Sequence, residues 1–176
     1  MEFAEELKEH AEKARDSFDR KVGATMAVIA AGLALVAVYG HITTTEELLG
    51  QQGASDQWAF YQAKALRRYQ SEVARDLLSA VGGGPSAPLA RKYDGSVERY
   101  RKEGDEVQAK AREFERESQV SGRRALRLHL GEIFLEMALV FASLAILTKR
   151  VLFWAAGLGS SGLGAAVAIT TLLIRL

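Results

Sequence analysis

The chain has 176 residues and a mass of 19.2 kDa, about the length of one domain, which argues against a multidomain enzyme. Its 23 Lys and Arg residues nearly balance 22 Asp and Glu residues, so no strong overall field points to nucleic acid or to an acidic substrate. The absence of cysteine excludes disulfides, thiolate metal sites and cysteine nucleophiles. With only two prolines, the chain is expected to be almost entirely helical.

The N-terminal segment, residues 1–21, carries apolar residues at helical spacing and is predicted to be a cytoplasmic amphipathic helix that pairs with another helix. An uncharged run follows from Val22 to Gly40. At about 1.5 Å per residue this run is long enough to cross a hydrocarbon core. We assign residues 22–42 to a first transmembrane helix. A charged, patterned segment precedes it, which is unlike a cleaved secretory signal, so we expect the helix to be an uncleaved anchor.

A long charged segment, residues 43–129, separates this span from the next apolar run and is predicted to be an extracytoplasmic helical hairpin. Its second half has apolar or small residues at alternating steps of three and four, which is the spacing of a coiled coil. We call these positions the second-arm seam: Ala90, Tyr93, Val97, Tyr100, Gly104, Val107, Ala111, Phe114, Ser118, Ser121, Ala125 and Leu128.

The first half of the segment is expected to supply the partner helix of this antiparallel coiled coil. Thr43 or Thr44 is expected to cap its start, and Gly50 and Gly53 to mark a kink. The glycine- and proline-rich stretch 82–88 is expected to form the tip. We predict a first-arm seam at Ala59, Ala63, Leu66, Val73, Leu77 and Ala80.

Two further apolar runs follow the hairpin. Residues 130–148 are apolar except for Glu132 and Glu136, and residues 151–174 carry no charge. We assign a transmembrane helix to each. The expected fold class is therefore an all-α integral membrane protein, with three transmembrane helices and a long antiparallel coiled-coil hairpin between the first and the second.

The expected topology follows from Lys and Arg in short segments, which favour the cytoplasmic side. The N-terminal segment contains several such residues, and Lys149–Arg150 form the tight turn between the second and third spans. Both are placed in the cytoplasm. The hairpin is too long for its charges to decide its side, so it falls in the periplasm or outside the cell.

Residues 54–64, ASDQWAFYQAK, lie shortly after a first span that ends in a Thr-Thr-Glu sequence. This run, with one span, a charged hairpin and two closing spans around it, resembles an uncharacterised bacterial membrane family, domain of unknown function 4337 (DUF4337). The resemblance covers nearly the whole chain. It implies a multi-pass protein of the bacterial inner (cytoplasmic) membrane, and it implies no reaction.

Ionisable residues near the start of the second span form a candidate intramembrane polar or ion site. The second-arm seam continues to Glu132, and antiparallel pairing sets His129 opposite His41. An acid exposed to lipid at the helix centre costs about 2.5 kcal/mol or more. Either these residues line a proton or cation path or bind a metal, or they lie at headgroup level and only fix helix register. The candidates are Tyr39, His41, His129, Glu132 and Glu136.

Two further groups are candidates for an oligomer interface. On the first arm, four residues lie beside the predicted seam, where they pack against another copy or a partner, or else cover the hairpin's own flank: Trp58, Tyr61, Ala65 and Tyr69. In the third span, small residues repeat every four positions, which allows close helix approach within a subunit or between subunits: Gly157, Ser160, Ser161, Gly164 and Ala168.

No catalytic motif stands out, so we expect no catalytic residues, no metal ion, no cofactor and no nucleic-acid partner. The expected function is a non-enzymatic membrane protein, embedded in the lipid bilayer, that assembles with its own copies as a scaffold or is an accessory subunit of a larger membrane complex. The alternative is a channel or transporter component whose proton or cation path is lined by membrane-embedded Glu and His residues.

Overall fold

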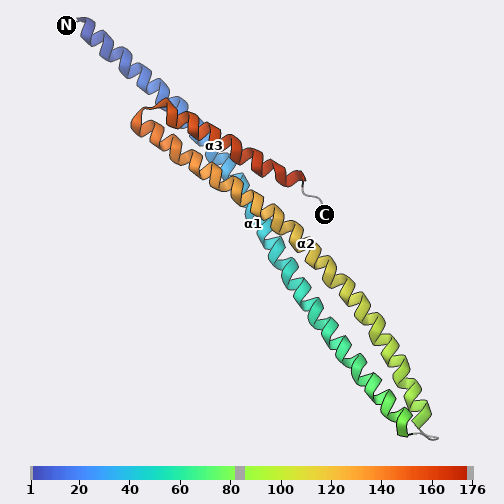
Figure 1. Cartoon of the computed structure of the whole chain (residues 1–176). Coiled ribbons are helices and arrows are strands. Elements are labelled where there is room, and N and C mark those ends of the chain that lie inside the picture. Colours follow the sequence, from blue (N-terminus) through green and yellow to red (C-terminus); the bar gives the residue numbers. More distant parts are fainter. Residues whose placement is uncertain (1, 82–85, 174–176) are drawn as a thin grey trace. The chain divides into compact units, whose positions relative to one another are not determined.

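The computed structural model describes residues 2–81 and 86–173, with side chains described for residues 17–81 and 87–173. Almost all of this part is helical, and no strand occurs in it. The described residues form three helices, labelled in Figure 1: α1 (Glu2–Val81), α2 (Ser86–Thr148) and α3 (Val151–Ile169). A 3-10 turn, η1 (Thr170–Leu173), follows α3.

The described residues divide into two units. Residues 2–45 and 120–173 form one, which we call the terminal unit, and residues 46–81 and 86–119 form the other, which we call the hairpin unit. All three helices contain a stretch that is long and apolar enough, by length and composition, to cross a membrane. The side chains of residues 1–16, where the sequence predicts an amphipathic helix, lie outside the described part.

Helix α1 runs without interruption through the points at which the sequence predicted a helix start and a kink. The Thr43 hydroxyl donates to the carbonyl oxygen of Tyr39 at 3.0 Å, and the Thr44 hydroxyl lies 2.9 Å from the carbonyl oxygen of Gly40. Hydroxyls that bond back to the preceding turn are already inside a helix. The expected cap at Thr43 or Thr44 is therefore wrong.

In the terminal unit, α1 packs against α2 mainly through small side chains of α2. Val22 is buried against Ala142 and Ala145, and Ile29 against Ala138 and a leucine one turn earlier. Alanine at these positions lets the two backbones approach, so each β-branched residue of α1 fills the space that a larger α2 residue would need.

Helix α3 returns along α2 after the two-residue turn Lys149–Arg150. Lys149 has a φ of 56°, which is the left-handed region, and its ammonium pairs with the carboxylate of Asp19 on α1. On α3, Ser160 donates to the carbonyl oxygen of Phe134 at 2.7 Å. A side chain that bonds to α2 backbone is in the interior of the unit rather than on its surface.

In the hairpin unit, α1 and α2 lie antiparallel. The contacting pairs run in opposite directions along the two helices: Glu47 with Ser118, Trp58 with Glu115, Lys64 with Glu103 and Arg75 with Asp94. Residues 82–85 of the expected tip lie outside the described residues, and α2 already begins at Ser86. Pro88 therefore falls in the first turn of α2, where a missing N–H breaks no helical hydrogen bond.

The face of α2 toward α1 is the second-arm seam, every member of which is buried or half-buried. The face of α1 is a different one from that predicted. Gly50 and Ala54 are buried and Tyr61 is half-buried, whereas all six members of the first-arm seam are exposed. Gly50 and Gly53 let the α1 backbone come close to Ser118 and Phe114 of α2, so this small-residue face makes the contact and the first-arm seam points away from α2.

Candidate functional site

A chain of three polar side chains joins α1 and α2 in the terminal unit. His129 Nε2 lies 3.2 Å from the Thr44 hydroxyl oxygen, and His129 Nδ1 lies 3.2 Å from Glu132 Oε2. The side chain of Glu132 is 24% exposed and that of His129 is 44% exposed. Gly40 lies beside the His129 ring, where an added Cβ would be 3.5 Å from the imidazole Cε1, an ordinary van der Waals contact. Hydroxyl, imidazole and carboxylate in this order can hold and pass a proton.

The other candidates of the predicted ion site lie apart from this chain. Tyr39, His41 and Glu136 are exposed residues of the described chain. His129 faces Thr44 rather than His41, because Gly40 occupies the buried face of α1 and the next residue points away from α2. Among the described residues there is no group of three or more His, Asp or Glu suited to hold a metal ion.

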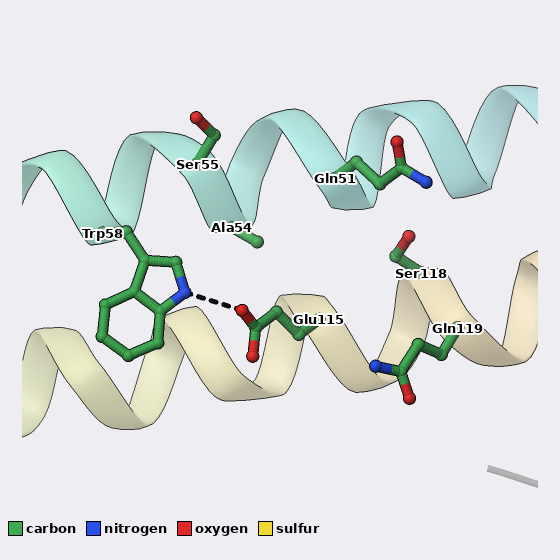
Figure 2. A pocket seen from close by; sticks show the side chains of 7 residues that line it. All are labelled: Gln51, Ala54, Ser55, Trp58, Glu115, Ser118 and Gln119. Carbon is green, nitrogen blue, oxygen red and sulfur yellow. Dashed lines mark hydrogen bonds between the residues drawn. The ribbon is translucent and has the colours of Figure 1, made fainter.

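A pocket of about 390 Å³ opens beside Trp58 in the hairpin unit (Figure 2). The Trp58 indole donates from Nε1 to Glu115 Oε1 at 2.7 Å, which ties the aromatic ring across to α2. Trp58 also meets Tyr61 edge to face, with ring centroids 5.6 Å apart. The pocket is lined by Gln51, Ala54, Ser55, Trp58, Glu115, Ser118 and Gln119.

The two backbones approach each other closely at Ser118, which is one of the residues that line this pocket. The Ser118 hydroxyl donates to the carbonyl oxygen of Glu47 at 3.0 Å. A Cβ on Gly50 would lie 2.9 Å from the Cβ of Ser118, so only glycine fits there. Glycine at residue 50 therefore marks a close contact between the two helices.

Ion pairs farther along the hairpin unit bind the two helices in one register. The Lys64 ammonium pairs with Glu103, and this hydrogen bond holds the pKa of the Glu103 carboxyl below its usual value. Arg75 bonds Asp76 and reaches Asp94 on α2 at 3.5 Å, and the bond to Asp76 raises the pKa of the Arg75 guanidinium. Both groups are therefore charged at neutral pH.

The predicted interface residues fall into two sets in the structure. On α1, Trp58, Tyr61 and Ala65 are half-buried in the hairpin unit, and Tyr69 is 64% exposed. On α3, Ser161 is half-buried, and the other four predicted residues are buried against α2 within the same chain: Gly157, Ser160, Gly164 and Ala168. The small-residue face of α3 is thus covered by α2.

Within the described residues of the hairpin unit, large apolar side chains are exposed mainly on α1. On α1 eight are exposed: Leu48, Leu49, Phe60, Leu66, Tyr69, Val73, Leu77 and Val81. On α2 the described part of this unit exposes only Leu89. The sequence signal for this surface was the first-arm seam itself, which we had assigned to the contact within the hairpin.

The chain was compared with protein families, curated proteins and solved structures. A family model described as "Domain of unknown function (DUF4337)" matches residues 18–174. No curated protein and no solved structure matches. The match includes all the contacts described above.

Proposed function

This chain therefore belongs to the DUF4337 family, and we propose that it is a non-enzymatic protein of the bacterial inner membrane that assembles with its own copies as a scaffold. One observation carries the proposal: eight large apolar side chains are exposed on α1 of the hairpin unit and one on α2. Exposed apolar patches on one side of a protein are typical of an interaction surface. An accessory subunit of a larger complex would use the same surface for a different protein.

The experiment is to measure the mass of the complex in native lipid nanodiscs by native mass spectrometry, with crosslinking in intact membranes beforehand. We expect a discrete homo-oligomer in both. A single copy in the nanodisc and no crosslinked species in membranes would contradict the proposal. An unrelated protein at fixed stoichiometry would favour the accessory subunit instead.

The proposed topology places the N-terminus in the cytoplasm and the hairpin outside it. The chain has no cysteine, so single-cysteine variants report position without interference. Glu106→Cys on the exposed surface of α2 is expected to react with a membrane-impermeant thiol reagent in spheroplasts. Arg20→Cys on α1 is expected to react only after the membrane is permeabilised. The reverse pattern would invert the proposed orientation.

A channel or transporter component is the second candidate, favoured by the hydrogen-bonded chain of Thr44, His129 and Glu132. Proteoliposomes carrying a pH-sensitive dye test it. If the protein is a channel, we expect a proton flux that falls at least tenfold in Glu132→Gln. The flux should persist in Glu136→Gln, because Glu136 is exposed and is not part of the hydrogen-bonded chain. Absence of flux, or equal flux in both variants, would eliminate this candidate.

A further inference from the structure

The exposed face of α1 in the hairpin unit has the repeat of a coiled coil. Ala63, Gln70 and Leu77 lie seven residues apart. A second set with the same spacing lies three or four residues from the first and consists of Ala59, Leu66, Val73 and Ala80. We call the two sets together the outer stripe: Ala59, Ala63, Leu66, Gln70, Val73, Leu77 and Ala80. All seven residues are exposed, with 58% for Leu66 and 62% for Leu77.

We propose that the outer stripe pairs with the outer stripe of a second copy, parallel and in register, so that Gln70 meets Gln70 of that copy. The inference rests on the proposed self-assembly in a membrane, because insertion in one bilayer sets the relative orientation of the two copies. Copies inserted the same way into one bilayer are related by rotation about the membrane normal, and equivalent residues then lie at equal heights. Self-pairing of α1 under that symmetry is parallel.

The repeat itself identifies a helix as the occupant. A partner helix requires apolar residues every 3.5 positions, whereas a lipid surface selects no such spacing. Each copy carries the same repeat, so the side chains of two outer stripes can pack between one another without a second kind of protein. Arg67 and Asp76, which are exposed next to the stripe, also argue against burial of this face in hydrocarbon.

The residues flanking the outer stripe fit the parallel arrangement without repulsion. In a parallel pair, each flanking residue on one edge meets the residue five positions later in the other copy. Gln62 then meets Arg67, Tyr69 meets Ala74 and Asp76 meets Val81, and no two like charges face each other. The stripe therefore carries no electrostatic penalty against its own copy.

Exposed aromatic side chains beside the outer stripe supply part of the area that a stable pair buries. Phe60 and Tyr69 flank the stripe with 59% and 64% of their surfaces exposed. An aromatic side chain buries about 150–250 Å², so these two supply on the order of 200 Å² of the roughly 800 Å² that each partner usually buries. The aliphatic residues of the stripe add to this area along a length of roughly 30 Å.

Gln70 gives the pairing its register. A polar residue at one core position of a coiled coil specifies the alignment and the number of strands, because its amide must find a partner. In register, the two Gln70 side chains can donate to and accept from each other. A shift by one heptad would set each Gln70 against Leu77 or Ala63 and leave both amides without a partner.

Single-cysteine crosslinking in native membranes tests this pairing, because the wild-type chain contains no cysteine. A disulfide requires Cα atoms within about 7 Å. We expect Leu66→Cys and Leu77→Cys each to form a disulfide-linked dimer. The matched controls Ala65→Cys, half-buried toward α2, and Asp105→Cys, exposed on α2, are expected to remain monomeric on the same gel.

Each result decides between alternatives. An antiparallel pair brings equivalent residues together only near its centre, so dimers at one of the two positions and not the other would overturn the parallel pairing. A crosslink from Leu66→Cys to an unrelated protein would overturn the second copy as occupant. If nanodiscs hold a discrete oligomer but neither variant crosslinks, this inference is wrong and the proposed function stands. Monomers in both experiments contradict the two together.

A second variant measures the contribution of the stripe without touching the hairpin contacts. Leu66→Glu with Leu77→Glu places like charges at two core positions of the proposed pair, while both residues are exposed in the single chain. We expect the dissociation constant of the dimer to be at least tenfold higher than in the wild type, while the helical circular dichroism signal stays unchanged. Unchanged dimerisation would overturn the pairing.

Discussion

Gly131 and Gly164 meet backbone to backbone at the crossing of α2 and α3. A Cβ on Gly131 would lie 2.9 Å from the carbonyl oxygen of Gly164, and a Cβ on Gly164 would lie 2.7 Å from the carbonyl oxygen of Gly131. Neither position admits a side chain unless the helices separate, because the obstructing atoms are backbone. This contact, with Ser160 bonded to the carbonyl oxygen of Phe134, fixes how α3 lies on α2.

Gly164→Leu is expected to displace α3 from α2 and to lower the free energy of unfolding by about 1–3 kcal/mol, the usual cost of overpacking. Gly162→Ala, on the same helix with open space around it, is the matched control and is expected to be neutral or slightly stabilising. Thermal unfolding in detergent, followed by circular dichroism, compares the two. Equal melting temperatures would show that α3 is not held by this crossing.

Gly50→Val is expected to weaken the hairpin by about 1–3 kcal/mol, since its Cβ would lie 2.9 Å from the Cβ of Ser118. Gly95→Ala, in α2 where nothing lies within 4 Å, is expected to stabilise by roughly 0.5–1 kcal/mol through helix propensity. Opposite shifts of the urea midpoint would support helix contact at Gly50. If Gly50→Val were as harmless as Gly95→Ala, the close approach would be wrong.

Stability is expected to depend on pH through Glu103. The Lys64 hydrogen bond lowers the folded-state pKa of the Glu103 carboxyl, so its contribution is present above the unfolded pKa, about 4.3, and is lost as the pH falls through the lower folded value. Glu103→Gln should therefore be less stable than the wild type at pH 7, with the difference vanishing in strong acid. Urea unfolding at several pH values measures this.

The control for this pH dependence is Glu106→Gln, an exposed acid on the same helix. We expect its difference from the wild type to be small at every pH. A Glu103→Gln difference that persists unchanged at low pH would mean that the effect comes from packing rather than from charge.

Trp58 and Glu115 are expected to be energetically coupled through the indole hydrogen bond of 2.7 Å. Trp58→Phe keeps an aromatic ring and removes the donor, and Glu115→Ala removes the acceptor. In a double-mutant cycle, the decrease in the free energy of unfolding caused by Trp58→Phe should be about 1 kcal/mol smaller when Glu115 is already alanine. Strictly additive losses in urea unfolding would show that the bond contributes nothing.

Several features of this protein could be predicted from the sequence because they depend on local periodicity. The second-arm seam of α2 is buried or half-buried at all twelve positions, as its heptad spacing predicts. The long apolar runs predicted three apolar helices, and the structure has three helices with such stretches. Residues 54–64, with the surrounding order of spans, indicated the family that the match over residues 18–174 establishes.

The polar chain in the terminal unit could be predicted only in part. His129 and Glu132 are three residues apart, so helical spacing brings them together. Thr44 could not be identified as the partner of His129, because that contact depends on which residue of α1 faces α2. The side of α1 that holds Gly40 faces the imidazole, and His41 points away.

Only the tertiary structure decided which face of α1 meets α2 in the hairpin. Helix α1 has two candidate faces there, and apolar periodicity favours the one with Leu66 and Leu77. The structure instead buries Gly50 and Ala54, because these small residues allow the closer backbone approach to Ser118. A sequence specifies that a helix has an apolar stripe, but the packing of the whole chain determines which stripe is covered within the chain and which stays available for a partner.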